Sequence, residues 1–465
     1  MRQVMGWAAR TRFARLAAAS LAIGALAAPS AAGQTPGSFA PTGDMTVPRV
    51  NAVAAPLADG RVLVAGGVDP TQLDALTVLR SAEIFDPATG TFSPTGSMAI
   101  PRSGAAAAPL PDGRVLIAGG VDGVQGGNRT EVRSAEIFDP ATGTFSPTGD
   151  MSVVREDPAA APLPDGRVLV AGGQYYDRGS YLEKYLDSAE IFDPRTGTFS
   201  PTGSMTHPRS GAIAAAPLPD GGVLVAGGGW PFGHTAEIFD AATGEFAPTG
   251  DMTADRRTGA AAPLPDGRVL VVGGDGASWG YSAEVFDPVT GSFASTANTT
   301  TPRYDPVAAP LADGRVLVAG DPVGHGSRAL EKPRSAELYT PDLSYRLRGT
   351  KLKVTVGVAG ILTASAAKAR PRASAAVKPR PSLRKTRRKG SSGQISLKLK
   401  PKGKAMRTLQ RTGKLKIRVR LSFVPKRVWG KCVTRFSPCY SSNYAIHETR
   451  TLRLRVKKRT RSPHR

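Results

Sequence analysis

Two ionisable residues recur once in each of six similar stretches of the sequence, and charges of this kind can bind ions or move protons. An arginine opens each stretch, and a glutamate follows further along. A catalytic group is normally needed once, so sixfold recurrence favours a role in the scaffold. We expect each arginine to form an ion pair with a glutamate, within or between repeat units, buried enough to need its partner. The residues concerned are Arg49, Arg102, Arg155, Arg209, Arg256 and Arg303, with Glu83, Glu136, Glu190, Glu237, Glu284 and Glu337.

Histidine and cysteine are too scarce to predict a metal centre. Residues 33–345 contain only His207, His234 and His325, in different repeat units, and no cysteine. Because metal sites need several such ligands close together, we expect no metal and no cofactor. The only two cysteines, Cys432 and Cys439, are predicted to form a disulfide in an exported chain.

Other polar motifs also have structural explanations. The motif Asp-Pro-x-Thr-Gly is typical of a β-turn capped by its aspartate. The recurring double glycines end strands, and no helix follows that could bind phosphate. Asp69, Asp122 and Asp177 lie in loops, but their spacing matches no calcium-binding loop.

Tandem repetition indicates which elements hold these residues. The string R-V-L-V-A-G-G at 61–67 has close copies that end at Gly120, Gly173, Gly228, Gly274 and, with Asp in place of the last glycine, Asp321. A second string, S-A-E-I-F-D-P-x-T-G, follows in each unit, first at 81–90. Short apolar runs bounded by Gly, Pro and Asp predict four strands per unit, and no helical periodicity intervenes.

Repeat units of about 50 residues, with four strands and a double glycine, resemble the kelch repeat. Two aromatic residues separated by six others complete the pattern, here Phe85 and Phe92 where the family has Tyr and Trp. The resemblance implies an all-β fold, a six-bladed β-propeller over residues 37–345. Galactose oxidases share this propeller, but their copper site needs a cysteine crosslinked to a tyrosine. The lack of cysteine in residues 33–345 therefore argues against that oxidase chemistry.

The sixth unit lacks its outer strand. Tyr339 has Arg346 at the position where the second aromatic residue is expected. A spare copy of the missing strand, Ser38 to Gly43, lies near the N-terminus. We predict that it pairs with Ser335 to Thr340 and closes the ring, which removes exposed strand edges.

The loops between the second and third strands differ in every unit, so we expect a ligand on their face of the propeller. Rigid aromatic side chains with polar edges suit sugars or peptides. The alternative is that they only pack their own loops. The candidate ligand-binding residues are Tyr175, Tyr176, Tyr181, Trp230, Phe232, Trp279 and Tyr281. Alanine-rich inner strands predict a narrow central channel.

The two ends of the chain differ from its body. Residues 1–32 combine four arginines, an apolar run and small residues, which is typical of a signal peptide. Residues 33–345 carry 21 Lys and Arg against 36 Asp and Glu, whereas residues 346–465 carry 36 against one. Alternating sequences predict strands in this basic segment, which resembles an Ig-like β-sandwich, with a flexible loop over 369–392.

These features predict a secreted or cell-surface-associated binding protein with no transmembrane segment once the signal peptide is removed. Its ligand, a glycan or a protein, would lie on the variable loop face. The basic segment would attach to an anionic polymer of the cell envelope, and nucleic acid is disfavoured for an exported chain. The alternative is a secreted carbohydrate-active enzyme that uses the same loop face.

Overall fold

The computed structural model describes residues 37–71, 77–125, 128–211, 214–229, 232–274, 280–320 and 334–341, together with the backbone of strands between 345 and 455. Every regular element in these ranges is a β-strand, so the expected all-β fold is confirmed. The predicted signal peptide, residues 1–32, lies outside them. Within the same ranges, no helix is long and apolar enough to cross a membrane.

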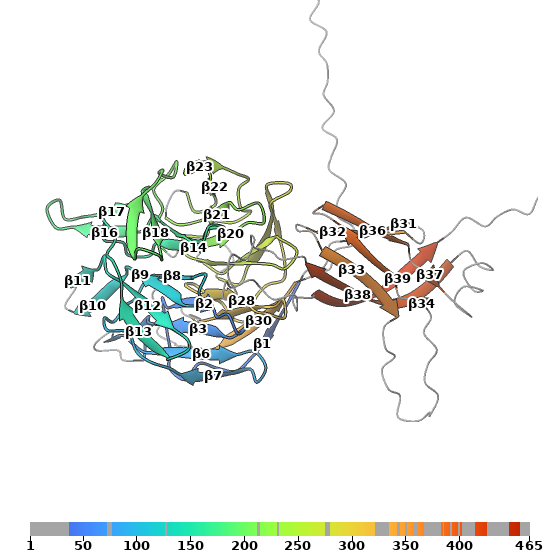
Figure 1. The fold of residues 1–465 in the computed structure, drawn as a ribbon, viewed down its shortest axis with the longest axis horizontal. Coiled ribbons are helices and arrows are strands. Elements are labelled where there is room, and N and C mark those ends of the chain that lie inside the picture. Colours follow the sequence, from blue (N-terminus) through green and yellow to red (C-terminus); the bar gives the residue numbers. More distant parts are fainter. Residues whose placement is uncertain are drawn as a thin grey trace, which may run out of the picture. The chain divides into compact units, whose positions relative to one another are not determined.

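Six antiparallel sheets of four strands each form a ring of blades around one axis (Figure 1). We label the strands of each blade a to d from the axis to the rim. In that order the blades are β2 (Val53–Pro56), β3 (Val62–Ala65), β6 (Ala82–Asp86), β7 (Thr91–Pro94); β8 (Ala106–Pro109), β9 (Val115–Ala118), β12 (Ala135–Asp139), β13 (Thr144–Pro147); β14 (Ala159–Pro162), β15 (Val168–Ala171), β18 (Ala189–Asp193), β19 (Thr198–Pro201); β20 (Ala214–Pro217), β21 (Val223–Ala226), β22 (Ala236–Asp240), β23 (Glu245–Pro248); β24 (Ala260–Pro263), β25 (Val269–Val272), β26 (Ala283–Asp287), β27 (Ser292–Ser295); and β28 (Val307–Pro310), β29 (Val316–Ala319), β30 (Ala336–Thr340), β1 (Ser38–Pro41).

Strand b of each blade is an uninterrupted apolar run because both of its faces are buried between blades. In β3, Leu63 packs in a cluster with Val115 of blade 2, whereas Val62 packs in a cluster with Leu317 of blade 6. The two Phe residues of each repeat face each other across strands c and d, and the ring centroids of Phe85 and Phe92 lie 4.8 Å apart. The core therefore consists of layers between neighbouring blades.

The predicted closure of the ring is confirmed. Strand β1 pairs with β30 in the register Ser38↔Thr340 and Phe39↔Tyr339, so the N-terminal strand is the outer strand of blade 6. Tyr339 takes the place of a phenylalanine here, and its ring centroid lies 4.9 Å from that of Phe39. Its hydroxyl group lies 2.9 Å from Oγ1 of Thr296 in blade 5, so its polar end is satisfied.

The inner strands surround a small central cavity, at the place where their alanine content predicts a narrow channel. A cavity of about 110 Å³ is lined by small residues of strands a, among them Ala54, Ala107, Ala160, Ala261 and Ala308. Side chains of this size let the six strands approach the axis closely.

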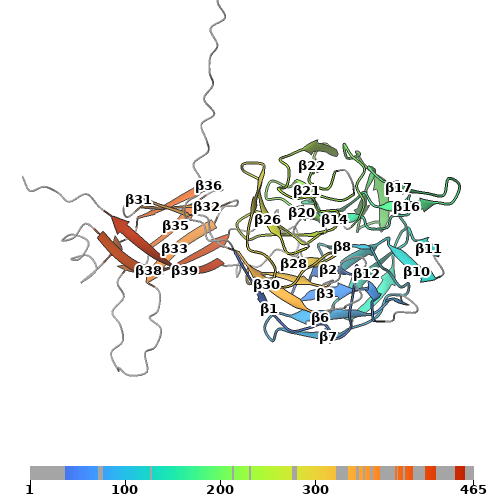
Figure 2. The same cartoon turned by 180° about the vertical axis from the view of Figure 1, so that it is seen from behind.

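Three loops between strands b and c are themselves hairpins. They comprise β4 (Val68–Asp69) with β5 (Thr77–Val78), β10 (Val121–Gln125) with β11 (Asn128–Glu131), and β16 (Gln174–Asp177) with β17 (Leu182–Tyr185). Figures 1 and 2 show the last two hairpins lying side by side at the edge of the propeller.

Beyond the propeller, the basic segment forms the expected strands. One sheet has the order β31 (Tyr345–Arg348), β32 (Lys351–Val356), β36 (Gly393–Lys398), and another has the order β35 (Thr386–Gly390), β33 (Gly360–Ala366), β38 (Lys414–Pro425), β39 (Ile446–Arg455). The short strands β34 (Leu383–Arg384) and β37 (Lys400–Pro401) form a further pair.

The prediction of a flexible loop over 369–392 is wrong in its C-terminal part. Leu383–Arg384 and Thr386–Gly390 are strands, and the latter pairs with Gly360–Ala364. A Pro/Lys/Arg-rich composition does not reveal that a partner strand is available elsewhere in the chain. Residues 369–382, as well as Cys432 and Cys439 of the predicted disulfide, lie outside the described residues.

Candidate ligand-binding face

The recurring arginine and glutamate form a buried ion pair in every blade, as expected. In blade 2, Arg102 donates from Nε and Nη2 to one carboxylate oxygen of Glu136, at 3.3 and 3.2 Å. Its Nη1 donates to the carbonyls of Gly119 and Ser134. Both charged side chains are almost fully buried. The six pairs are Arg49–Glu83, Arg102–Glu136, Arg155–Glu190, Arg209–Glu237, Arg256–Glu284 and Arg303–Glu337.

The glutamate also binds the backbone of the connector that enters its blade. Glu136 accepts a hydrogen bond from the amide of Ala99 at 2.8 Å, and Glu190 accepts one from the amide of Ser152 at the same distance. Each ion pair therefore fixes the segment that leads from one blade to the next.

Burial and hydrogen bonding shift the pKa values of these groups. Burial lowers the pKa of the guanidinium groups of Arg49, Arg102, Arg155 and Arg256. Burial alone would raise the pKa of Glu237, but hydrogen bonds from Thr206 and Arg209 outweigh it, so this pKa lies below its ordinary value. These groups are committed to the scaffold and are not available to a ligand.

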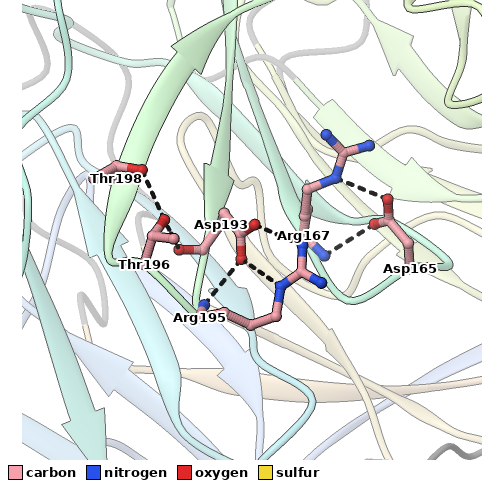
Figure 3. A network of polar contacts seen from close by, with 6 residues as sticks. All are labelled: Asp165, Arg167, Asp193, Arg195, Thr196 and Thr198. Carbon is pink, nitrogen blue, oxygen red and sulfur yellow. Dashed lines mark hydrogen bonds and ion pairs between the residues drawn. The ribbon is translucent and has the colours of Figure 1, made fainter.

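The face that carries turns a–b and c–d also satisfies its own charges. Figure 3 shows these turns in blade 3, where Asp165 binds Arg167 and Asp193 binds Arg195. The Arg195 side chain and amide lower the pKa of Asp193 to about 2. Similar Asp–Arg pairs occupy turn a–b in blades 1, 2, 5 and 6. We call this surface the turn face.

The opposite surface, the loop face, carries the b–c loops and most of the candidate residues. Tyr175 and Tyr176 lie on β16, and Tyr181 lies in the turn that follows. Tyr176 is 41% exposed and Tyr181 76% exposed, while Tyr175 is half-buried. The structure thus brings three of the predicted residues together on one hairpin.

The remaining candidates lie on other blades. Phe232 packs against the ring of His207, with centroids 4.0 Å apart, so it contacts the connector that enters blade 4. Tyr281 of blade 5 is partly exposed and accepts a hydrogen bond at its carbonyl from the Thr299 amide. Trp230 and Trp279 lie outside the described residues.

A group of polar residues that lines the central cavity was not predicted from the sequence. The side-chain amide of Asn51 donates to Asp157 at 3.0 Å, and both residues have positive φ. They line the central cavity together with Asp305. The sequence does contain a sign of this group, because the position two residues after the repeated arginine varies between connectors that are otherwise similar. It is Asn51, Gly104, Asp157, Gly211, Thr258 and Asp305 in the six units.

Within the part of the chain that the structure describes, no group of three or more His, Cys, Asp or Glu residues is placed to hold a metal ion. His207 lies beside Phe232, and His234 binds Asp255 through Nδ1 at 2.9 Å. The third histidine of the propeller, His325, lies outside this part. Asp69 and Asp177 cap their own turns.

Comparison with known proteins found one matching family and two proteins to which this chain is similar. The Kelch motif family matches residues 50–99, 101–152 and 158–206. An F-box/kelch-repeat protein of Arabidopsis thaliana is 35% identical over 107 residues, which are 23% of this chain and 26% of that protein. The chain thus spans about a quarter of the length of this relative. Among solved structures, a fungal alcohol oxidase of the AA5 family, in complex with copper, is similar with a TM-score of 0.47 and 16% identity, over 90% of this chain and all of that chain.

The fold and the motifs together define the class of protein. The chain folds as a six-bladed β-propeller, and its first three blades carry Kelch motifs.

Proposed function

We propose that this protein is an exported, cell-surface-associated binding protein that holds its ligand, a protein or a glycan, on the loop face. One observation carries the proposal. The charged side chains that hold the connectors, and those of the turn face, form ion pairs that repeat from blade to blade. The loop face, by contrast, differs between blades and exposes aromatic side chains. Loops on a rigid scaffold are the usual place for recognition.

The path of the chain supports this assignment. Ser38 and Thr340 are register partners at the turn face, in the place that turn c–d occupies in the other blades. Segments attached to either end of the propeller therefore leave from the turn face.

The basic segment supports attachment to an anionic polymer of the cell envelope. Residues 346–465 carry 36 Lys and Arg against Glu448 alone. In the register of strands β38 and β39, Lys414 is the partner of Arg455, and Lys416 is the partner of Arg453. A polyanion would supply the counter-charge that this basic segment lacks.

The test uses the full-length mature protein and variants of each face. Tyr281→Ala combined with Tyr176→Ala should weaken binding to a glycan array or to protein partners, while Arg61→Ala on the turn face should leave it unchanged. Equal loss in both variants would contradict the loop-face assignment. For the basic segment, we expect sedimentation with cell-wall fragments at low salt that falls steeply as salt is raised. A protein that stays in the supernatant at low salt would refute the attachment.

A further inference from the structure

The exposed apolar side chains of the propeller are concentrated on one hairpin. Among the described residues, six large hydrophobic side chains are exposed, and four of them lie within β16, β17 and the turn between these strands. The four are Tyr176, Tyr181, Leu182 and Tyr185. Single exposed apolar residues need no explanation, but such a group indicates an interaction site. Figures 1 and 2 show that the hairpin projects from the body of the propeller.

This hairpin is held rigid without any ligand. The carboxylate of Asp177 accepts hydrogen bonds from the amide of Gly179 at 2.9 Å and from the hydroxyl of Ser180 at 2.7 Å. These bonds lower the pKa of Asp177 below its ordinary value. The amide of Tyr181 donates to the Asp177 carbonyl, which fixes Tyr181 at the tip with φ of 57°.

Neighbouring elements hold the base of the hairpin. The amide of Tyr176 donates to the carboxylate of Glu131 on the adjacent hairpin, at 3.0 Å. Gln174 exchanges two backbone hydrogen bonds with Glu156 in the connector to blade 3. A partner that binds such a prepared surface loses less free energy to ordering it.

The register defines the chemistry of the exposed side of the hairpin. Gln174 lies opposite Tyr185, and Tyr176 lies opposite Glu183, so Tyr176, Glu183 and Tyr185 share one face. All three are exposed, whereas Tyr175 and Lys184 on the other face are half-buried. The hydroxyl of Tyr185 donates to Glu183 at 3.4 Å. A carboxylate between two phenol rings suits a cation, through charge-assisted hydrogen bonds and cation–π contacts.

We propose that this face of the β16–β17 hairpin docks a basic peptide segment of a partner protein, with an Arg or Lys side chain seated between Tyr176 and Tyr185 and bound to Glu183. Tyr181 and Leu182 at the tip bind its apolar neighbours. The acidic charge of residues 33–345, 21 cations against 36 anions, attracts such a segment. This inference rests on the proposed function, because it specifies the class of ligand and the part of the loop face that binds it.

The experiment selects displayed random short peptides on the full-length mature protein at moderate salt. We expect the retained peptides to share an Arg or Lys. Glu183→Gln and Tyr176→Ala should each weaken their binding about tenfold, the range that one cation–π or charged contact supports. Val289→Ser is the matched control, because it removes an exposed apolar side chain from turn c–d of blade 5, away from the loop face, and it should leave the affinity unchanged. Thermal unfolding confirms that each variant is folded.

Each of the following outcomes would overturn the docking site. These are retained peptides without a cation, peptides that bind the Glu183→Gln and Tyr176→Ala variants as tightly as the parent, or the absence of any selected peptide. A neutral glycan whose binding depends on Tyr176 and Tyr185 would also overturn it. Binding that depends on Tyr281 and not on the hairpin would refute this site and keep the loop face as the binding face. Binding that no loop-face variant alters would refute both.

Discussion

Gly67 donates its backbone N–H to the carbonyl oxygen of Arg102 at 2.8 Å, which joins the end of strand b in blade 1 to the connector that enters blade 2. The side chain of the same arginine binds Glu136 of blade 2. The bond recurs between Gly120 and Arg155, Gly173 and Arg209, Gly228 and Arg256, and Gly274 and Arg303. The double glycine and the Arg–Glu pair are therefore two halves of one inter-blade clamp.

This clamp explains why the first glycine of each pair must lack a side chain. Gly66 has φ of 67°, and a Cβ atom there would meet the Arg102 carbonyl oxygen at 2.3 Å. Gly66→Ala should lower the free energy of unfolding by at least about 1–3 kcal/mol, from the backbone conformation alone. Gly123→Ala is the control, because nothing lies within 4 Å of the added atom. Equal urea midpoints for the two variants would contradict the clamp.

Removing one charge from a buried ion pair should lower the free energy of unfolding far more than removing one charge from an exposed ion pair. Glu136→Gln leaves Arg102 buried without its counter-charge, and we expect a loss of about 3–5 kcal/mol in unfolding free energy. Asp112→Asn breaks the exposed Arg114–Asp112 pair and should cost at most about 1 kcal/mol. Chemical denaturation measures both, and similar losses would show that burial does not govern these pairs.

The ring should depend on its N-terminal strand. Deletion of residues 33–46 removes β1 and leaves the edge of β30 open. It also removes Thr46, whose amide donates to Glu83 in blade 1. We expect a lower melting temperature and a broader transition in calorimetry, because blades 6 and 1 lose a shared core. An unchanged melting temperature would mean that closure adds nothing to stability.

Acid should weaken the clamps in a defined pH range. The pKa values of Glu237 and Glu337 lie below the ordinary 4.5, since hydrogen bonds and the paired arginines overcome the effect of burial. A lowered pKa in the folded state gives stability that is complete above 4.5 and is lost as the pH falls through the folded value. Urea unfolding at a series of pH values should show this decline, and it should be shallower in Glu237→Gln. If Glu237→Gln lost stability in acid as steeply as the parent protein, the decline would not come from these glutamates.

The sequence predicted the elements that repetition exposes. The Arg–Glu pairs, the facing Phe residues and the closing strand at Ser38 all follow from comparing one unit with the next. The hairpin β16–β17 did not follow, because its register depends on the Asp177 turn and on Glu131 of a neighbouring blade. Likewise, Asn51 and Asp157 meet only because the ring brings connectors 106 residues apart to one axis.

In blade 6 no turn joins strands c and d, because the two ends of the propeller, Thr340 and Ser38, meet there. The ring could therefore begin and end at another blade. In blade 2, four residues, Pro140 to Gly143, join the strands that correspond to β30 and β1. A similar bridge from Thr340 to Ser38 would yield a circular permutant, with new termini cut into any turn such as Asp220–Gly222. Engineers could then move a fusion partner or surface tether from blade to blade while the same β-sheet pairing persists.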